Sequence, residues 1–352
     1  MIEERPASPA PEPVPHRRRP RYSGKHPRAF SLKYKERESN PETIAKVLAA
    51  GKTPAGTHRP IMVAEVLETL APKAGEIGAD CTLGYGGHAR ELLARLLPGG
   101  RLIGLDADPI ELPKTEARLR ALGFGPDVFS VCRSNFAGLG QVLGSLDLSG
   151  ADLLLADLGV SSMQLDDPAR GFSMKSDGPL DMRMNPQRGQ PASALLAKAS
   201  APEFQDLLRE HADEPHAAVL SVALAGKLIP TTRALANAIR ATLPRVNLED
   251  REMAVRRVFQ ALRIWVNDEF SALDSFLRQV PHLLNPGGRV AIITFHSGED
   301  RRVKKAFLAG FREGVYEDFA QEVIRPASAE RNANPRSAPA KLRWARKASG
   351  LG

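Results

Sequence analysis

The sequence predicts an α/β fold in which a mostly parallel sheet is interrupted by an inserted helical subdomain. Two observations predict this class. Short apolar runs alternate with amphipathic segments of helical length, which is typical of βαβ units and a parallel sheet. The alternation then stops, and residues 166–250 keep a helical periodicity but contain no convincing strand.

The first half of the chain predicts four strands with helices between them. A helix with apolar residues from Val63 to Leu70 comes first and is closed by Pro72. Leucines at helical spacing predict a second helix, which ends at Pro98, and a third is expected over Pro109–Leu122. The strands are predicted over Glu76–Thr82, Arg101–Leu105, Asp127–Cys132 and Ala151–Ala156.

The second half predicts the helical insertion and the remaining strands. One long helix is expected after the insertion, with an apolar stripe that runs from Val255 to Leu273. The insertion helices are predicted over Glu203–His211, His216–Leu228 and Arg233–Leu243, the last with Thr231 or Thr232 as its N-cap. The later elements are a strand over Arg289–Phe295, a helix over Glu299–Leu308 and two short strands near Glu322–Arg325 and Lys341–Ala345.

Charge and proline are concentrated at the ends of the chain, whose formal net charge is +8. Residues 1–57 hold 12 basic and 6 acidic side chains with nine prolines, and residues 323–352 hold 7 basic and 1 acidic. We expect a disordered basic arm over 1–57, which either contacts nucleic acid or is a solvated tail. The predicted main domain covers 58–165 and 251–352, and the helical insertion covers 166–250.

Composition excludes several classes of protein. No segment approaches the roughly 18 consecutive apolar residues that a membrane span needs. The only cysteines are Cys81 and Cys132, which are too few for a disulfide scaffold and favour a reducing, cytoplasmic compartment. The cysteines and the eight histidines show no ligand spacing, so no metal site is predicted.

Acidic residues follow the predicted strands at the points where ligands bind in open α/β sheets. Asp80, Asp106 and Asp157 end three strands, His296 follows another, and Phe136 comes shortly after the third strand. Packing alone would favour apolar or turn residues at such positions. Three carboxylates there indicate a ligand with a cationic part and with sugar hydroxyls.

A glycine loop follows the first strand, and by itself it leaves three interpretations open. The segment Gly84-Tyr-Gly-Gly-His-Ala89 satisfies the dinucleotide-binding pattern, and Asp106 lies about 20 residues further on. A nicotinamide cofactor, S-adenosylmethionine or a plain tight turn would each account for it. In either cofactor interpretation, Asp106 would accept hydrogen bonds from ribose hydroxyls.

Eight longer strings narrow the choice because they occur together in one order. They are His58-Arg-Pro-Ile61, Asp80–His88, Asp157–Asp166, Arg170-Gly-Phe-Ser173, Asp177–Met184, Ala261–Glu269, Phe295–Arg301 and Asn334-Pro-Arg-Ser337. From about residue 58 to residue 347 the chain resembles the bacterial small-subunit ribosomal RNA cytosine-N4 methyltransferases (the RsmH/MraW family). The resemblance implies a class I S-adenosylmethionine-dependent methyltransferase fold, Rossmann-like, with a helical insertion. It also implies N4-methylation of one cytosine in the decoding (P-site) region of 16S rRNA.

The resemblance assigns cofactor contacts to particular residues of this chain. S-adenosylmethionine would be bound by Gly86, Gly87, His88, Asp106, Phe136, Asp157 and Gln164. The glycines would let the backbone approach the methionyl part, and Phe136 would pack on the adenine. Asp157 would lie near the reactive end, where it is the candidate for accepting a hydrogen bond from the target amine.

The resemblance also indicates residues that would meet the RNA, each with a structural alternative. The candidates are Arg170, Phe172, Asp177, Asp181, Arg183, Trp265, Asn267, His296 and Arg336. Phe172 and Trp265 would stack on a base, or else belong to the core of the insertion. The charged residues would position rRNA or brace their own loop with ion pairs, and His296 would orient the substrate or bond to backbone.

Four functions therefore compete on the sequence alone. The leading hypothesis is an rRNA methyltransferase whose partner is small-subunit rRNA, within the small ribosomal subunit. A diverged paralogue could act on another nucleic-acid cytosine, and a non-catalytic ribosome-binding factor could retain the fold. A nicotinamide-dependent oxidoreductase depends on the glycine loop alone.

Overall fold

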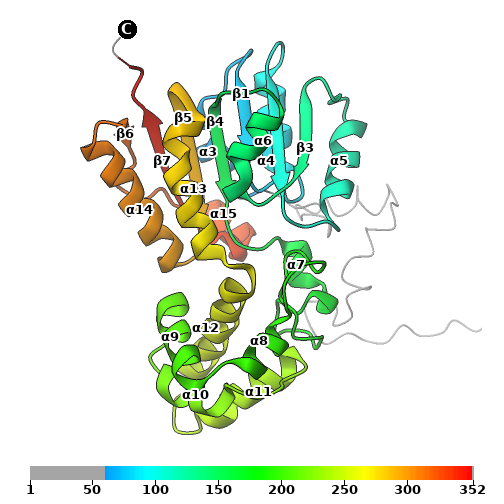
Figure 1. Ribbon diagram of the computed structural model, residues 1–352, viewed down its shortest axis with the longest axis vertical. Coiled ribbons are helices and arrows are strands. Elements are labelled where there is room, and N and C mark those ends of the chain that lie inside the picture. Colours follow the sequence, from blue (N-terminus) through cyan, green and yellow to red (C-terminus); the bar gives the residue numbers. More distant parts are fainter. Residues whose placement is uncertain (1–59, 351–352) are drawn as a thin grey trace, which may run out of the picture. The chain divides into compact units, whose positions relative to one another are not determined.

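The computed structural model describes residues 60–350 (Figure 1). The predicted disordered arm over 1–57 lies outside these residues. The described chain contains a sheet with helices on both faces and a group of helices that pack on one another. Within residues 60–350, no helix is both long and apolar enough to cross a membrane.

The predicted mostly parallel sheet is confirmed. Its seven strands within the described residues have the order β3-β2-β1-β4-β5-β7-β6. The first five strands in this order are parallel to one another, and β7 is antiparallel to both β5 and β6. The bounds are β1 Ile77–Asp80, β2 Arg101–Asp106, β3 Phe129–Arg133, β4 Ala151–Asp157, β5 Leu284–Thr294, β6 Tyr316–Phe319 and β7 Lys341–Lys347.

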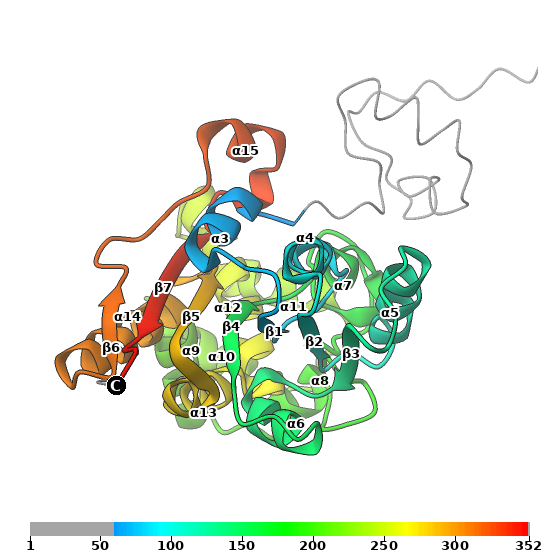
Figure 2. The ribbon, with the colours of Figure 1, turned by 90° about the horizontal axis from the view of Figure 1, so that it is seen from above.

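Two layers of helices cover the sheet (Figure 2). An apolar core lies between the sheet and each layer of helices, and strand β4 contributes side chains to both cores. Leu153 and Leu155 belong to one core, and Leu154 and Ala156 belong to the other. This alternation is the period-2 pattern of a strand buried on both faces. The first core takes helices α3 (Val63–Leu70), α4 (Gly87–Leu96) and α5 (Leu112–Ala121), and the second takes α6 (Leu139–Ser145), α13 (Glu269–Leu283) and α14 (Ser297–Arg312).

The prediction for the sixth strand was wrong in position. Glu322–Arg325 is not a strand; within it, Ile324 forms only an isolated bridge to Leu342. The strand lies earlier, over Tyr316–Phe319, because Tyr316 is 3% exposed and packs edge-on against Phe307 with ring centroids 5.7 Å apart. The buried aromatic anchors this segment to α14, whereas the later segment is more exposed.

The single long helix predicted after the insertion is two helices. Helix α12 (Leu248–Asn267) ends where Asp268 adopts a left-handed conformation with φ 50°, and α13 begins at the next residue. The apolar stripe continues across this break, but its residues pack into two different cores. Val255 packs among the insertion helices, whereas Leu273 packs against the sheet. A stripe of apolar residues therefore does not show that the helix is continuous.

The residues between β4 and α12 include the three predicted helices, which pack around a core that they share with α12. Thr231 caps the third insertion helix by accepting the backbone N–H of Ala234. The second ends at Leu224 rather than at the predicted Leu228, which is 74% exposed. The helices are α7 Ser162–Asp166, α8 Ala192–Lys198, α9 Ala201–Ala212, α10 Ala217–Leu224 and α11 Thr232–Thr242. The short α15 Ser328–Ala333 follows β6.

Candidate active site

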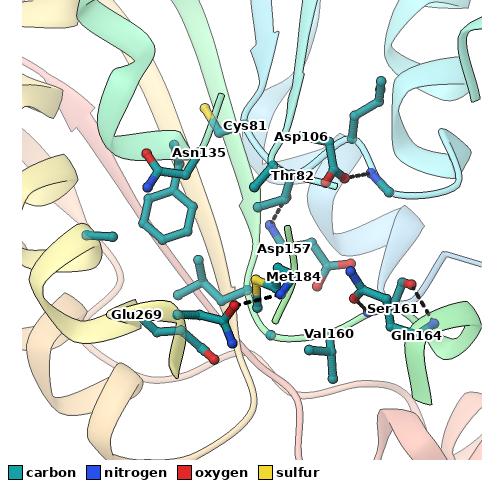
Figure 3. Close-up of a pocket in the computed structure, with 18 of the residues that line it drawn as sticks. Cys81, Thr82, Asp106, Asn135, Asp157, Val160, Ser161, Gln164, Met184 and Glu269 are labelled. Atoms are coloured by element: carbon teal, nitrogen blue, oxygen red, sulfur yellow. Dashed lines mark hydrogen bonds between the residues drawn. The ribbon is translucent and has the colours of Figure 1, made fainter. Parts of the chain in front are cut away.

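A cavity of about 1020 Å³ lies at the carboxyl ends of the central strands. One side is formed by the glycine loop and the ends of β2 and β4, and the other by loop 183–189 and the start of α13. Figure 3 shows Asp106 on the first side, Glu269 on the second and Asp157 between them. The parallel strands bring the acids together, because their carboxyl ends share one edge of the sheet.

The glycine loop is packed too closely for larger side chains at two positions. Gly86 has φ 81° and precedes α4, and a Cβ there would lie 2.9 Å from Cγ2 of Thr115. A Cβ on Gly87 would lie 2.7 Å from the ring of Pro60. The loop therefore needs glycine for its own packing. Gly84 and Gly87 line the cavity, whereas Gly86, a predicted cofactor contact, does not.

His88, in the first turn of α4, is 7% exposed and lines the cavity. Its Nε2 lies 2.9 Å from the carbonyl oxygen of Ile61, to which it donates. Its Nδ1 lies 3.8 Å from Oδ2 of Asp157. The histidine thus connects the glycine loop with the acid that ends β4.

Asp106 ends β2 with its carboxylate held by the backbone. Its Oδ2 accepts the N–H of Gly84 and its Oδ1 accepts the N–H of Asp108, each at 2.8 Å. Burial raises the pKa of Asp106 above its ordinary value, although these two N–H groups oppose the rise. Each oxygen keeps a second lone pair, so the carboxylate can accept two further hydrogen bonds from a ligand.

Asp157 ends β4 and brings an incompletely bonded carboxylate to the cavity. Its side chain is 26% exposed, and among the described residues its Oδ1 has no hydrogen-bond partner. Burial, then the charges of Asp80 and Glu299, raise the pKa of Asp157 to about 8. The buried Asp80 beside it also has a raised pKa, about 7, mainly because of burial. Such a cluster of carboxylates favours a cationic ligand.

Phe136 and Gln164 complete the side of the cavity that carries the predicted cofactor contacts. Phe136 is half-buried and packs edge-on against Phe276, with ring centroids 5.6 Å apart. Gln164 is 7% exposed, and its amide is fixed by two hydrogen bonds. It accepts the N–H of Ser161 at 2.9 Å and donates to Oδ2 of Asp108 at 2.9 Å.

Three of the predicted RNA contacts lie on the wall of the cavity: Arg183, Asn267 and Arg336. Arg183 is held by a bidentate ion pair with Asp181, in which both hydrogen bonds are 2.7 Å long. Asn267 accepts the N–H of Met184 at 2.7 Å. Arg336 is 39% exposed and pairs with a carboxylate oxygen of the α7 helix end at 2.7 Å.

Two predicted RNA contacts pack in or against the core of the helical insertion instead of lining the cavity. Phe172 is 7% exposed within this core, and Trp265 is partly buried against it.

Three polar candidates are also turned to other partners. Asp177 lies 3.7 Å from the guanidinium of Arg233. His296 caps α14 by accepting the backbone N–H of Glu299 on its Nδ1, and its Nε2 lies 3.0 Å from Oε1 of Glu299. Arg170 is 8% exposed and forms an ion pair with Asp108 at 2.8 Å.

Sequence reasoning missed a cluster of charged residues on the far side of the cavity. Arg263 forms a bidentate pair with Glu269 at 2.8 and 2.9 Å and lies 3.8 Å from Glu299. Burial opposes ionisation of Glu299, but His296, Arg263 and a backbone N–H outweigh it and lower its pKa. Arg263 and Glu269 belong to the string Ala261–Glu269, and Glu299 belongs to the string Phe295–Arg301, both of which carried the family resemblance. The pairing of Arg263 with Glu269 depends on the helix break at Asp268, which the apolar stripe concealed.

The fold and the cavity define an α/β protein with a ligand-sized cavity at the carboxyl edge of its sheet, where such folds bind their ligands. The model of the MraW methylase family matches residues 55–348, and the chain belongs to this family. The resemblance found in the sequence is thereby confirmed, and the chain is a methylase. Among residues 60–350, no group of three or more His, Cys, Asp or Glu side chains is placed to hold a metal ion.

Curated relatives match along nearly their whole length. A "Ribosomal RNA small subunit methyltransferase H 1" from Lachnoclostridium phytofermentans is 49% identical over 96% of this chain and 94% of its own. A "Ribosomal RNA small subunit methyltransferase H 2" from Alkaliphilus metalliredigens is 48% identical over 94% of this chain and 97% of its own. A "Ribosomal RNA small subunit methyltransferase H" from Thioalkalivibrio sulfidiphilus is 42% identical over 83% of this chain and 98% of its own.

Proposed function

We propose that this chain transfers a methyl group from S-adenosylmethionine to the exocyclic N4 of a cytosine in the decoding region of small-subunit rRNA. Membership of the MraW methylase family supports methyl transfer. The names of relatives that are 42–49% identical support rRNA of the small subunit as the substrate. The observation that carries the proposal is the Asp157 carboxylate, which lines the cavity at the end of β4 and has a side chain that is 26% exposed.

The residues of the cavity fit S-adenosylmethionine. Asp106 has lone pairs left for the two ribose hydroxyls, and the half-buried ring of Phe136 offers a face for the adenine. Gly84 and Gly87 of the glycine loop line the cavity, and the methionyl part would lie along their backbone. When bound, the cofactor supplies a methyl group activated by the positive sulfonium.

Asp157 would act on the amine that receives the methyl group. The lone pair of the cytosine N4 is delocalised into the ring, which makes this nitrogen a poor nucleophile. It becomes more nucleophilic when a carboxylate accepts a hydrogen bond from one of its N–H groups. The ionised carboxylate of Asp157 can do this and can take the proton that leaves. A cationic ligand nearby lowers a raised pKa, so cofactor binding would favour the ionised form.

The far side of the cavity would hold the base and the RNA strand. A cytosine must be single-stranded or flipped out of a helix to enter a cavity at the edge of the sheet. Arg183, Arg188 and Arg336 surround the cavity with exposed or partly exposed guanidinium groups. We expect these groups to contact phosphates, so RNA binding should weaken with salt.

Methyl transfer to isolated subunits tests the proposal. The full chain is incubated with S-adenosylmethionine carrying a labelled methyl group and with small subunits from cells that lack this protein. We expect one methyl group per subunit, located by mass spectrometry on N4 of a decoding-region cytosine. A methyl group at another cytosine would make the chain a diverged paralogue. Cofactor binding without any transfer would favour a non-catalytic ribosome-binding factor.

A further inference from the structure

A buried network of side chains starts at the cofactor side of the cavity. Asp108, which lies between β2 and α5, is 1% exposed. Its Oδ2 accepts hydrogen bonds from Nε2 of Gln164 at 2.9 Å and from Nη1 of Arg170 at 2.8 Å. Its Oδ1 accepts the N–H of Ile110 at 2.8 Å. Because all three side chains are at least nine-tenths buried, water does not compete for these bonds.

The same arginine reaches the loop on the opposite side. Nη2 of Arg170 donates to the carbonyl oxygens of Arg183 at 3.1 Å and Met184 at 2.9 Å. The N–H of Met184 in turn donates to Oδ1 of Asn267 at 2.7 Å, and Nδ2 of Asn267 donates to the carbonyl of Met182 at 2.8 Å. Residues 182–184 are therefore clamped between Arg170 and the end of α12, and Arg183, Met184 and Asn267 line the cavity.

Two residues that we propose as cofactor contacts touch this network directly. Asp106 accepts the backbone N–H of Asp108 at 2.8 Å, and Gln164 donates to the Asp108 carboxylate. Both Asp106 and Gln164 line the cavity. A cofactor that fixes these two side chains also fixes Asp108, and through it the guanidinium of Arg170.

We propose that Arg170 is a positioning residue that couples cofactor binding to the order of loop 182–185, and thereby to binding of the RNA. It acts through the carbonyls of that loop and does not contact the RNA itself. The inference depends on the proposed function only for the identity of the cofactor and the RNA. A guanidinium is required because it presents several donors in a fixed plane, whereas a lysine presents one compact ammonium.

Hydrogen exchange measures this coupling without RNA. S-adenosylhomocysteine is added to the full chain, and backbone exchange is followed in loop 182–185 and in the glycine loop 84–88. We expect the ligand to slow exchange in loop 182–185 by about tenfold in the wild type and by less than about twofold in Arg170→Lys. Exchange in the glycine loop should slow equally in both proteins.

Arg240→Lys is the matched control for this substitution. Arg240 forms a bidentate pair with Glu252 at 2.6 and 2.8 Å, between α11 and α12, and neither residue lines the cavity. The control should therefore behave as the wild type. Asp108→Asn is the second variant if Arg170→Lys does not fold, and it should also lose the slowing in loop 182–185.

Methylation kinetics add a measurement that a loss of general stability would not reproduce. Arg170→Lys should raise the KM for small subunits by about tenfold, change kcat by less than about threefold and leave the affinity for S-adenosylhomocysteine unchanged. Equal slowing of loop 182–185 in wild type and Arg170→Lys overturns the coupling, as does binding without slowing in the wild type. Failure of the wild type to bind the ligand overturns the proposed function and the coupling together.

Discussion

The two sides of the cavity are built in different ways. On the cofactor side, Asp106 and Asp157 are the last residues of parallel strands. The carboxylate of Asp106 accepts the backbone N–H of Gly84, and the backbone N–H of Asp157 donates to the hydroxyl of Thr82. On the far side, the wall depends on Arg170, Met184 and Asn267, which lie far apart in the sequence and meet through side-chain bonds to backbone. A sheet edge places its acids by topology alone, whereas the far wall exists only after the insertion has folded against α12.

The largest effect should come from Asp157, where the two sides meet. Replacement by asparagine keeps the shape of the side chain but cannot take the proton from the amine. We expect kcat for methylation of small subunits to fall by at least about 100-fold, measured by transfer of a labelled methyl group.

The control for that substitution is Asp213→Asn, which changes an exposed acid at the end of α9. It should leave kcat unchanged. A kcat for Asp157→Asn within about threefold of the wild type, in a protein that still binds S-adenosylhomocysteine, would remove Asp157 from the chemistry.

Asp106 tests the cofactor side by itself. Asp106→Asn places an amide group against the N–H of Gly84 or Asp108 and removes the charge that would bind ribose hydroxyls. We expect the Kd for S-adenosylhomocysteine to rise about 10- to 100-fold, measured by calorimetry. Asp177→Asn, outside the cavity, should leave the Kd within about twofold. An unchanged Kd in Asp106→Asn would mean that the ligand does not use this carboxylate.

The cofactor side could be predicted from the sequence because its geometry is local. Each acid follows an apolar run, and parallel strands put such residues at one edge, which the register of Asp80 with Gly104 and Leu155 confirms. The sheet was predicted for the same reason, apart from β6. There, Tyr316 anchors a strand by packing on Phe307, a contact that a short apolar run does not reveal.

The far side could not be predicted in the same way. Asp108 is two residues beyond Asp106 and is indistinguishable from a turn residue until Arg170 is found against it, 62 positions later. Asp268 lies within a stripe that predicts a continuous helix, although its φ of 50° ends α12 there. Both features depend on tertiary contacts that apolar periodicity does not encode.

A pH dependence follows from the raised pKa values on the cofactor side. Asp80 and Asp157 have pKa values of about 7 and about 8 in the folded chain, whereas the ordinary value of an aspartate is 3.8. At a pH between the ordinary and the raised value of each group, the folded chain therefore binds more protons than the unfolded chain. The free energy of unfolding of the cofactor-free protein should therefore fall as pH rises from about 4 to about 8, and level off above.

Thermal unfolding of wild type and Asp157→Asn at pH 5.5 and 8.5 checks this sign. The two proteins should differ little at the lower pH, where Asp157 is protonated, and the variant should be the more stable at the higher pH. A difference that does not change with pH would show that Asp157 is already ionised in the folded chain at pH 5.5.

The smallest effect should come from a change in the backbone at the far side of the cavity. This change distinguishes a loss of folding stability from a loss of substrate positioning. Asp268 and Asp213 both end helices in the left-handed conformation, with φ 50° and 49°. Valine is strained there, so Asp268→Val and Asp213→Val should each lower the free energy of unfolding by about 1–2 kcal/mol in urea titrations. Only Asp268→Val should also raise the KM for small subunits, because Asp268 sets Glu269 and Asn267 on the cavity wall. Equal KM values for the two variants would mean that the helix break does not position the substrate side.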